Sequence, residues 1–261
     1  MLAWVDPLAG FGVGLVVGLT GVGGGSLMTP VLVLLLGVAP ATAVGTDLWF
    51  AALTKLAGSA VHQGHGAVDW QVLRRLWLGS LPTSLALLVW LHVGTGPRMQ
   101  SPWVLHLLGV VLLLTAAAML LRGQAQALGR TLRLQDAARF KRWQPVLTVL
   151  AGVVLGGLVT LTSVGAGALG VVLLVYLYPL RMTGARLVAT DIAHAIPLTL
   201  LAGSGHALLG HVELGLLGRL LLGSVPGVML GAALAHRTPE RLLRPGIALM
   251  LLLVGGKLVA G

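Results

Sequence analysis

Cysteine and charged residues are what this sequence lacks. None of its 261 residues is cysteine, and only 9% are charged, while 57% are hydrophobic. The missing cysteine excludes disulfide scaffolds, thiolate metal sites and cysteine catalysis. A soluble globular chain carries about 25% charged residues, so 17 basic and 7 acidic side chains could not solvate a protein of this size. The composition therefore predicts an integral membrane protein.

Eight apolar stretches divide the chain. They cover residues 8–36, 41–61, 72–92, 103–121, 145–178, 187–205, 214–235 and 243–260. Six of them have about the length that one helix needs to cross a hydrocarbon core of roughly 30 Å. The first and fifth are too long, and glycine interrupts each of them, at residues 20–25 and 162–167. Glycine costs a helix interior about 1 kcal/mol relative to alanine, so these clusters predict helix breaks.

The chain also matches itself at an offset near 144 residues. The matches are the two glycine breaks, Thr46-Asp47 with Thr190-Asp191, residues 56–59 with 201–204, 66–69 with 210–213, and 78–82 with 222–226. Because the matches keep one order, a duplication is favoured over chance similarity between apolar segments. We predict a first repeat over 1–122, a basic cytoplasmic linker over 123–144 and a second repeat over 145–261.

The basic residues predict the orientation. Six of them lie between residues 122 and 142, which places this connection in the cytoplasm by the positive-inside rule. If the two interrupted stretches are hairpins that enter the membrane halfway and return, thirteen of the 17 basic residues lie inside and three outside. If all eight stretches cross, the distribution is ten to six. We prefer the hairpins, which give each half three crossings and hence opposite orientations in the membrane.

The predicted fold class is thus an all-α polytopic membrane protein. It consists of two inverted repeats, each a re-entrant glycine-tipped helical hairpin plus three transmembrane helices. Both termini would lie outside a cell inner membrane. In a soluble chain the net charge of +10 would suggest a nucleic-acid partner. In a membrane protein the basic residues instead indicate orientation, so no nucleic-acid partner is expected. The partners expected are a small anionic substrate and the lipid bilayer, and a homodimer is left open.

Residues 124–143 mix basic side chains with Leu128, Leu132, Phe140 and Trp143. This pattern fits a helix lying on the anionic inner leaflet. A solvated charged linker explains it equally well.

The glycine breaks are the first candidate binding site. Irregular backbone at membrane depth survives only inside protein or against a water-filled cavity. A helix starting at Ser26 or Ala168 would offer free N–H groups and the positive end of its dipole to an anion. The alternative, that the glycines only permit close helix packing, is weaker for two duplicated sites. The residues expected to bind substrate are Gly23, Gly24, Gly25, Ser26, Thr46, Lys55, Thr162, Gly165, Gly167 and Thr190.

Ionisable residues inside the spans are the second signal. Asp47 and Asp191 occupy equivalent positions, with Lys55 and His194 further along the same two helices. Such residues are costly in a membrane and mark pathways, proton relays or counter-ions. Asp191 and His194 share a helix face at this spacing, so Asp47, Asp191 and His194 are predicted to couple protons. Lys55 would face an anionic substrate or an Asp of the other repeat; a polar clamp between helices is the alternative.

Taken together, the sequence resembles the sulfite exporter TauE/SafE family. The resemblance rests on residues 21–30 (GVGGGSLMTP), 38–46 (VAPATAVGT), 66–70 (GAVDW) and 236–244 (HRTPERLLR). It implies an inner-membrane transporter of sulfur-containing anions, such as sulfite, thiosulfate or organosulfonates, coupled to protons or the membrane potential. This chain departs from the family where Asp47 and Asp191 replace the usual serine. Its second glycine cluster is also reduced to Gly165-Ala-Gly167.

The function predicted is a secondary transporter for a small sulfur-containing anion, without a cofactor or a metal. A cation or metal permease that uses the Asp and His residues is the nearest alternative, and a non-transporting membrane sensor is another. The sequence contains no nucleophile-and-base constellation, no two-histidine zinc motif and no nucleotide loop, so an enzyme is not expected.

Overall fold

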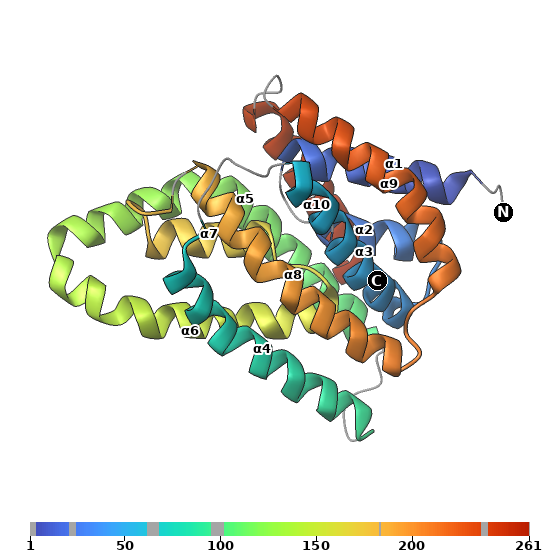
Figure 1. Ribbon diagram of the computed structural model, residues 1–261, viewed down its shortest axis with the longest axis horizontal. Coiled ribbons are helices and arrows are strands. Elements are labelled where there is room, and N and C mark those ends of the chain that lie inside the picture. The colour runs from blue at the N-terminus through green and yellow to red at the C-terminus, as the bar shows by residue number, and fades with distance from the viewer. Residues whose placement is uncertain are drawn as a thin grey trace.

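A computed structural model of the chain describes residues 4–20, 25–61, 68–94, 102–182, 184–235 and 240–260. The elements in these ranges are helices, gathered in one bundle (Figure 1). They are α1 (Val5–Thr20), α2 (Gly25–Leu34), α3 (Pro40–Val61), α4 (Trp70–His92), α5 (Pro102–Gln135), α6 (Ala137–Thr162), α7 (Ala168–Leu177), α8 (Gly184–Leu208), α9 (Leu214–Leu234) and α10 (Glu240–Ala260).

Six of the described helices are long and apolar enough to cross a membrane, namely α4, α5, α6, α8, α9 and α10. Helices α1 and α7 are apolar but shorter, with 16 and 10 residues. A bilayer core of roughly 30 Å needs about 20 helical residues, so neither crosses alone. The all-helical membrane protein that the composition predicts is confirmed.

The second interrupted stretch breaks where glycine predicts it. Helix α6 ends at Thr162, Ser163 takes a left-handed conformation with φ 59°, and Gly165 has φ 120°. A left-handed residue is a common end for a helix because its N–H can reach back to an earlier carbonyl, and that of Ser163 bonds to Val159 at 2.8 Å. Helix α7 then begins at Ala168, as expected. In the first repeat α2 begins at Gly25, one residue before the predicted start, and Gly23 and Gly24 lie outside the described residues.

The segment 123–144 differs from both interpretations of its sequence. It is neither a separate surface helix nor an irregular linker, because α5 continues to Gln135 and α6 begins at Ala137. Asp136 separates them, and its carboxylate accepts the N–H of Arg139 at 2.9 Å as an N-cap. Strong helix formers such as Gln, Ala, Leu and Arg fill the end of α5, which explains why it does not stop at the membrane surface. Figure 1 shows the two helix ends projecting together from one side of the molecule.

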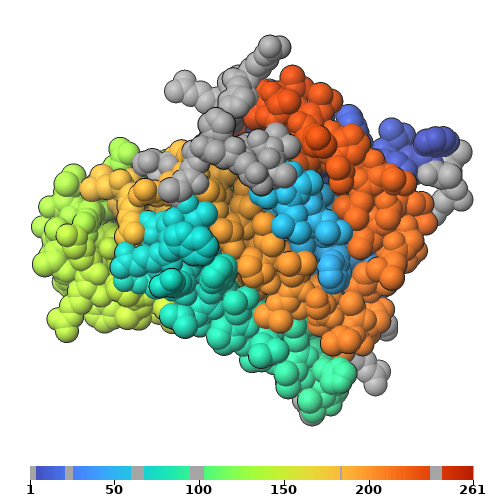
Figure 2. Space-filling view, in the orientation of Figure 1, coloured from blue at the N-terminus to red at the C-terminus, as the bar shows by residue number. Residues whose placement is uncertain are grey.

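Helices of the two halves pair reciprocally. The most extensive contact joins α1 to α9, and the next joins α4 to α6. When the two halves of the sequence are aligned at the offset near 144 residues, α1 corresponds to α6 and α4 to α9. The α1–α9 contact and the α4–α6 contact are therefore equivalent. The remaining large contacts join α5 to α10 and α3 to α8. Within each of these pairs the two helices are each other's counterparts in the aligned halves. Figure 2 shows α8 at the surface beside α3 and α4.

Small residues at every fourth position let α1 and α9 approach closely. They are Gly10, Gly14 and Gly18 on α1 and Gly223, Gly227 and Gly231 on α9. A Cβ atom at any of them would overlap backbone atoms of the facing helix. Gly79, Gly152 and Gly156 play the same part between α4 and α6. Tight packing across the halves therefore depends on glycines other than those of the breaks.

Replacing Gly10 with alanine is expected to destabilise the protein by about 1 to 3 kcal/mol, because the new methyl group would overlap the backbone of Leu220. Gly12 lies on the same helix with nothing within 4 Å of an added Cβ. Gly12→Ala should therefore leave the thermal midpoint in detergent unchanged or slightly raised, since alanine favours the helix. Equal midpoints for the two variants would contradict this packing.

Candidate functional site

Asp47 holds the short helix α2 in place. Its side chain is fully buried on α3, and its Oδ2 accepts both the backbone N–H and the hydroxyl of Thr29 on α2, the former at 3.1 Å. The Thr29 hydroxyl also lies 3.5 Å from the carbonyl oxygen of Thr162, at the end of α6. One carboxylate therefore holds α2 against α3, close to the break of the opposite repeat.

Asp191, its counterpart on α8, is held by a cation instead. Lys55 Nζ lies 3.5 Å from Asp191 Oδ2 and donates to the carbonyl oxygen of Ala166 at 2.8 Å. Both side chains are buried. Of the two roles that the sequence left open for Lys55, pairing with an Asp of the other repeat is confirmed by this contact. The ion pair crosses between the halves and ties α3 to the second break.

The different partners of the two carboxylates follow from the sequence of each repeat. At the offset of 142, Thr29 corresponds to Val171, which has no hydroxyl to donate. At the offset of 144, Lys55 corresponds to Thr199, whose hydroxyl bonds to the carbonyl oxygen of Ala195 in its own helix. Both predicted repeats thus contain the carboxylate, and they differ in the group that neutralises or binds it.

A small cavity lies between these groups. It is lined by Ser26 of α2, Ala51 and Lys55 of α3, Thr199 of α8 and the break residues Ser163 and Gly165–Gly167. Its volume of about 10 Å³ holds roughly one water molecule. Helix α7 begins here, with Gly167 at the N-cap and no side-chain hydrogen bond to its first N–H groups. A buried ammonium group and the start of a helix, both electropositive, therefore face the same small space.

Thr46 and Thr190 make a reciprocal contact between the halves. The Thr46 hydroxyl accepts the N–H of Glu213 at 3.1 Å, and that of Thr190 accepts the N–H of Asp69 at 3.0 Å. Glu213 and Asp69 are the N-cap residues of α9 and α4. Each threonine hydroxyl is thus engaged at a helix start of the other repeat, and neither lines the small cavity.

The connection between α8 and α9 is held by two histidines. His206 Nε2 lies 2.9 Å from the carbonyl oxygen of Thr160, and His206 Nδ1 lies 3.3 Å from His211 Nδ1. A carbonyl only accepts, so His206 Nε2 donates, and the Nδ1 of the neutral ring accepts from His211. Burial lowers the pKa of His211, which favours the neutral rings that this pairing needs.

Two further residues of the predicted site, His194 and Thr162, bond to groups that do not line the small cavity. His194 Nε2 is 3.0 Å from the hydroxyl of Ser80 on α4, and the described partner of the Asp191 carboxylate is Lys55 rather than His194. The Thr162 hydroxyl donates to Leu158 at 2.7 Å within α6 and accepts the N–H of Val164 at 3.2 Å. The structure therefore brings together Ser26, Lys55, Gly165 and Gly167 at the cavity and leaves His194 and Thr162 beside it.

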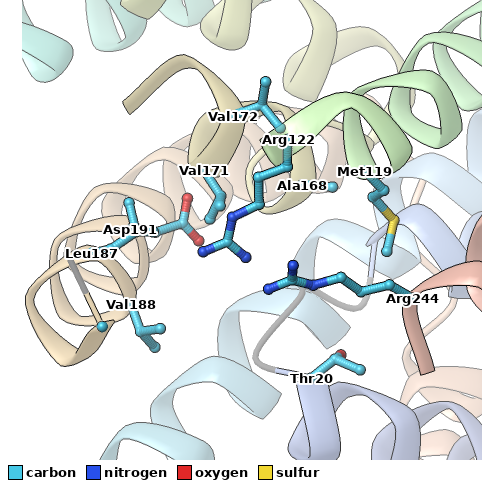
Figure 3. A pocket seen from close by; sticks show the side chains of 11 residues that line it. Thr20, Met119, Arg122, Ala168, Val171, Val172, Leu187, Val188, Asp191 and Arg244 are labelled. Atoms are coloured by element: carbon cyan, nitrogen blue, oxygen red, sulfur yellow. The ribbon is translucent and has the colours of Figure 1, made fainter. Parts of the chain in front are cut away.

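A second cavity, of about 160 Å³, has Asp191 in its lining (Figure 3). Its lining includes Thr20 at the end of α1, Ala168 at the start of α7, and two arginines, Arg122 of α5 and Arg244 of α10. Figure 3 shows the Arg122 guanidinium directed at the Asp191 carboxylate and the Arg244 guanidinium directed into the same space. Asp191 thus lines the arginine-containing cavity, and its ion-pair partner Lys55 lines the smaller one.

Comparison with known proteins gives a family match over nearly the whole chain. The family model described as "Sulfite exporter TauE/SafE" matches residues 7–258. The chain belongs to the sulfite exporter TauE/SafE family. It is similar to the "Probable membrane transporter protein YjnA" of Bacillus subtilis (strain 168), with 39% identity over 260 residues that cover 97% of this chain and 98% of that protein. The "Probable membrane transporter protein YdhB" of the same organism is 26% identical over 92% of this chain and 93% of its own length. No solved structure matches the chain.

As a TauE/SafE member the protein is a multi-pass membrane transporter. Sequence reasoning missed three residues of its candidate site. Thr29 stands four residues after the first glycine run, a spacing that puts it just past the first turn of α2, and this signal was available. Arg122 and Arg244 counted only as orientation markers, because their meeting depends on how α5 packs against α10.

Proposed function

We propose that the protein is a secondary transporter for a small sulfur-containing anion, such as sulfite, thiosulfate or an organosulfonate. The observation that carries the proposal is the buried Lys55 at the uncapped start of α7, with a two-arginine cavity beyond Asp191. Arginine and lysine bind oxyanions with charge-assisted hydrogen bonds, and helix starts favour negative charge. The substrate would be held between the two half-helix tips, at Gly23–Ser26 and Gly165–Ala168.

The proposed topology is two inverted repeats with re-entrant hairpins in a cell inner membrane. It is supported by contacts that return α7 to the beginning of the apolar part of α6: Gln144 bonds to the carbonyl of Leu177, and the hydroxyls of Thr148 and Tyr178 lie 2.7 Å apart. The reciprocal bonds of Thr46 and Thr190 also support a two-fold relation between the halves. Both termini would lie outside, with residues 123–144 in the cytoplasm.

Proton coupling is expected because Asp191 and the substrate anion would compete for the ammonium group of Lys55. An anion that enters the small cavity replaces Asp191 as the counter-ion of Lys55, so the two negative charges compete. A proton on Asp191 removes that competition and frees the ammonium group for the substrate. A proton on Asp47 similarly weakens its hold on Thr29, which lets α2 move and the cavity widen beyond the space of one water. Anion and proton would therefore travel together.

Flux into proteoliposomes tests the function. We expect uptake or counterflow of at least one of sulfite, thiosulfate and a small alkylsulfonate, driven by a pH gradient. The Arg122→Gln variant should raise the KM for that anion about tenfold or more, because one charge-assisted contact is lost. Arg130→Gln, on the exposed side of the same helix, is the matched control. If proteoliposomes that contain the folded protein transport none of the three anions, the proposal is wrong.

A cation or metal permease remains the second candidate, because Asp47 and Asp191 are buried carboxylates. In each of them one oxygen, Oδ1, has no hydrogen-bond partner among the described residues. Competition during flux separates the two candidates. An anion site should be blocked by other oxyanions and be indifferent to divalent metals, whereas a carboxylate site for cations should show the reverse.

A further inference from the structure

A basic cavity lies where the ends of four segments meet, away from the transport site. Its volume is about 310 Å³, and its lining includes Arg75 of α4, Arg133 of α5, Lys141 of α6 and Arg181 after α7. Helix ends on one face of the bundle supply all four cations. None of them lines either of the cavities at Asp191.

Most of this positive charge has no carboxylate to balance it. Arg181 is paired with Asp69, to which it donates at 2.7 Å. Arg75 donates to the hydroxyl of Tyr178 at 3.2 Å. Within the described residues Arg75, Arg133 and Lys141 form no ion pair, and the buried Nη1 of Arg133 has no hydrogen-bond partner. Burying a guanidinium nitrogen without a partner is costly, so an anion that enters the cavity would relieve that cost.

An apolar groove adjoins the basic cavity. Its volume is about 430 Å³, and most of its lining is apolar: Leu132, Phe140, Trp143, Leu147, Tyr176 and Leu177. Gln135, Asp136 and Arg139 add a polar edge, in which the charges of Asp136 and Arg139 offset each other. Gln144 lines both spaces. Trp143 is 53% exposed and Leu147 is 38% exposed, so the apolar walls of the groove are open to the surroundings. Both spaces lie at the ends of α5 and α6, which are long and apolar enough to cross the membrane.

We propose that the basic cavity and the apolar groove together bind one anionic phospholipid. Its phosphate would sit among Arg75, Arg133 and Lys141, and an acyl chain would lie along the groove past Trp143 and Leu147. Basic pockets between membrane helices suit phospholipid head groups, and tryptophan favours the level of the interface. Neither half of the site suffices alone: a free phosphate would leave the groove empty, and a neutral lipid would leave the cations unbalanced.

The bound lipid would contact the ends of several helices at once. Its head group would bridge the ends of α5 and α6 to the start of α4, and the acyl chain would cover the end of α7. The start of α6 and the end of α7 are the outer ends of the predicted second hairpin. The inner end of this hairpin, at the second break, forms part of the candidate transport site. The lipid is therefore expected to stabilise the position of α7.

Lipid-dependent thermal stability of the full chain in detergent tests the proposal. Phosphatidylglycerol should raise the unfolding midpoint by about 3 °C or more, while phosphatidylcholine should give a smaller shift. The variant Arg133→Gln/Lys141→Gln should lose the phosphatidylglycerol shift and keep the midpoint measured without lipid. Arg130→Gln/Arg142→Gln removes the same charge from exposed neighbours outside the cavity and should keep the shift.

Three results would overturn the proposal. They are an unchanged shift in the Arg133→Gln/Lys141→Gln variant, an equal shift with phosphatidylcholine, and a full shift with inorganic phosphate alone. The last result would identify a phosphate site without a lipid. If the cavity variant fails to fold, native mass spectrometry of the wild-type protein decides instead, by showing retained phosphatidylglycerol or none. The readout involves no flux, so the outcome is independent of the proposed transport function.

Discussion

Lys55→Met is expected to cause the largest loss of stability of any single change in the membrane core, about 3 to 5 kcal/mol. The reason is that breaking a buried ion pair from one side is strongly destabilising, and here it takes from the buried carboxylate of Asp191 the ammonium group that pairs with it. The carbonyl of Ala166 also loses its donor, which loosens the second break. Folded yield and the thermal midpoint in detergent measure the effect, and anion flux should be lost as well.

A double variant separates the charge effect from the loss of packing. Lys55→Met/Asp191→Asn removes both charges, so it should recover most of the stability while flux stays absent. Lys257→Met, an exposed lysine on a membrane helix, is the control for replacing an ammonium group by an apolar side chain. If the double variant is no more stable than Lys55→Met, the ion pair is not what holds α3 to the second break.

Asp47→Asn and Asp191→Asn are expected to abolish anion flux driven by a pH gradient while sparing exchange of anion for anion. An amide keeps the shape of the carboxylate but cannot take up or release a proton near neutral pH. In Asp47→Asn the amide oxygen can still accept the N–H of Thr29, so α2 should stay in place. Flux in proteoliposomes, with and without the gradient and with internal anion, measures both modes.

Thr29→Val is the control for these carboxylate variants, because it removes the hydroxyl bond to Asp47 without touching the proton site. Valine also occurs naturally at the equivalent position 171. It should cost about 1 to 2 kcal/mol of stability and leave gradient-driven flux in place. Unchanged proton coupling in both Asp variants would refute their assigned role and leave them as a clamp between helices.

Much of the fold could be predicted because it depends on local composition. The run lengths of apolar residues gave the helices, the glycine clusters gave the break after Thr162, and the scarcity of charge drew attention to Asp47, Lys55 and Asp191. The prediction for residues 123–144 was less successful. A change from apolar to basic composition signals where a helix leaves the membrane, but it does not end the helix, since arginine, glutamine and leucine all favour it.

The sequence by itself thus determined that this chain is an all-helical membrane protein with a break after Thr162, and it singled out Asp47 and Asp191, which the structure buries. Only the tertiary structure decided that Thr29 binds one carboxylate and Lys55 the other, that Thr46 and Thr190 hold helix starts of the opposite repeat, and that Arg122 and Arg244 share a cavity. The physical reason is one of range. Helix formation and helix breaks depend on neighbours within a few residues, whereas each of these contacts except that of Thr29 joins residues more than a hundred positions apart.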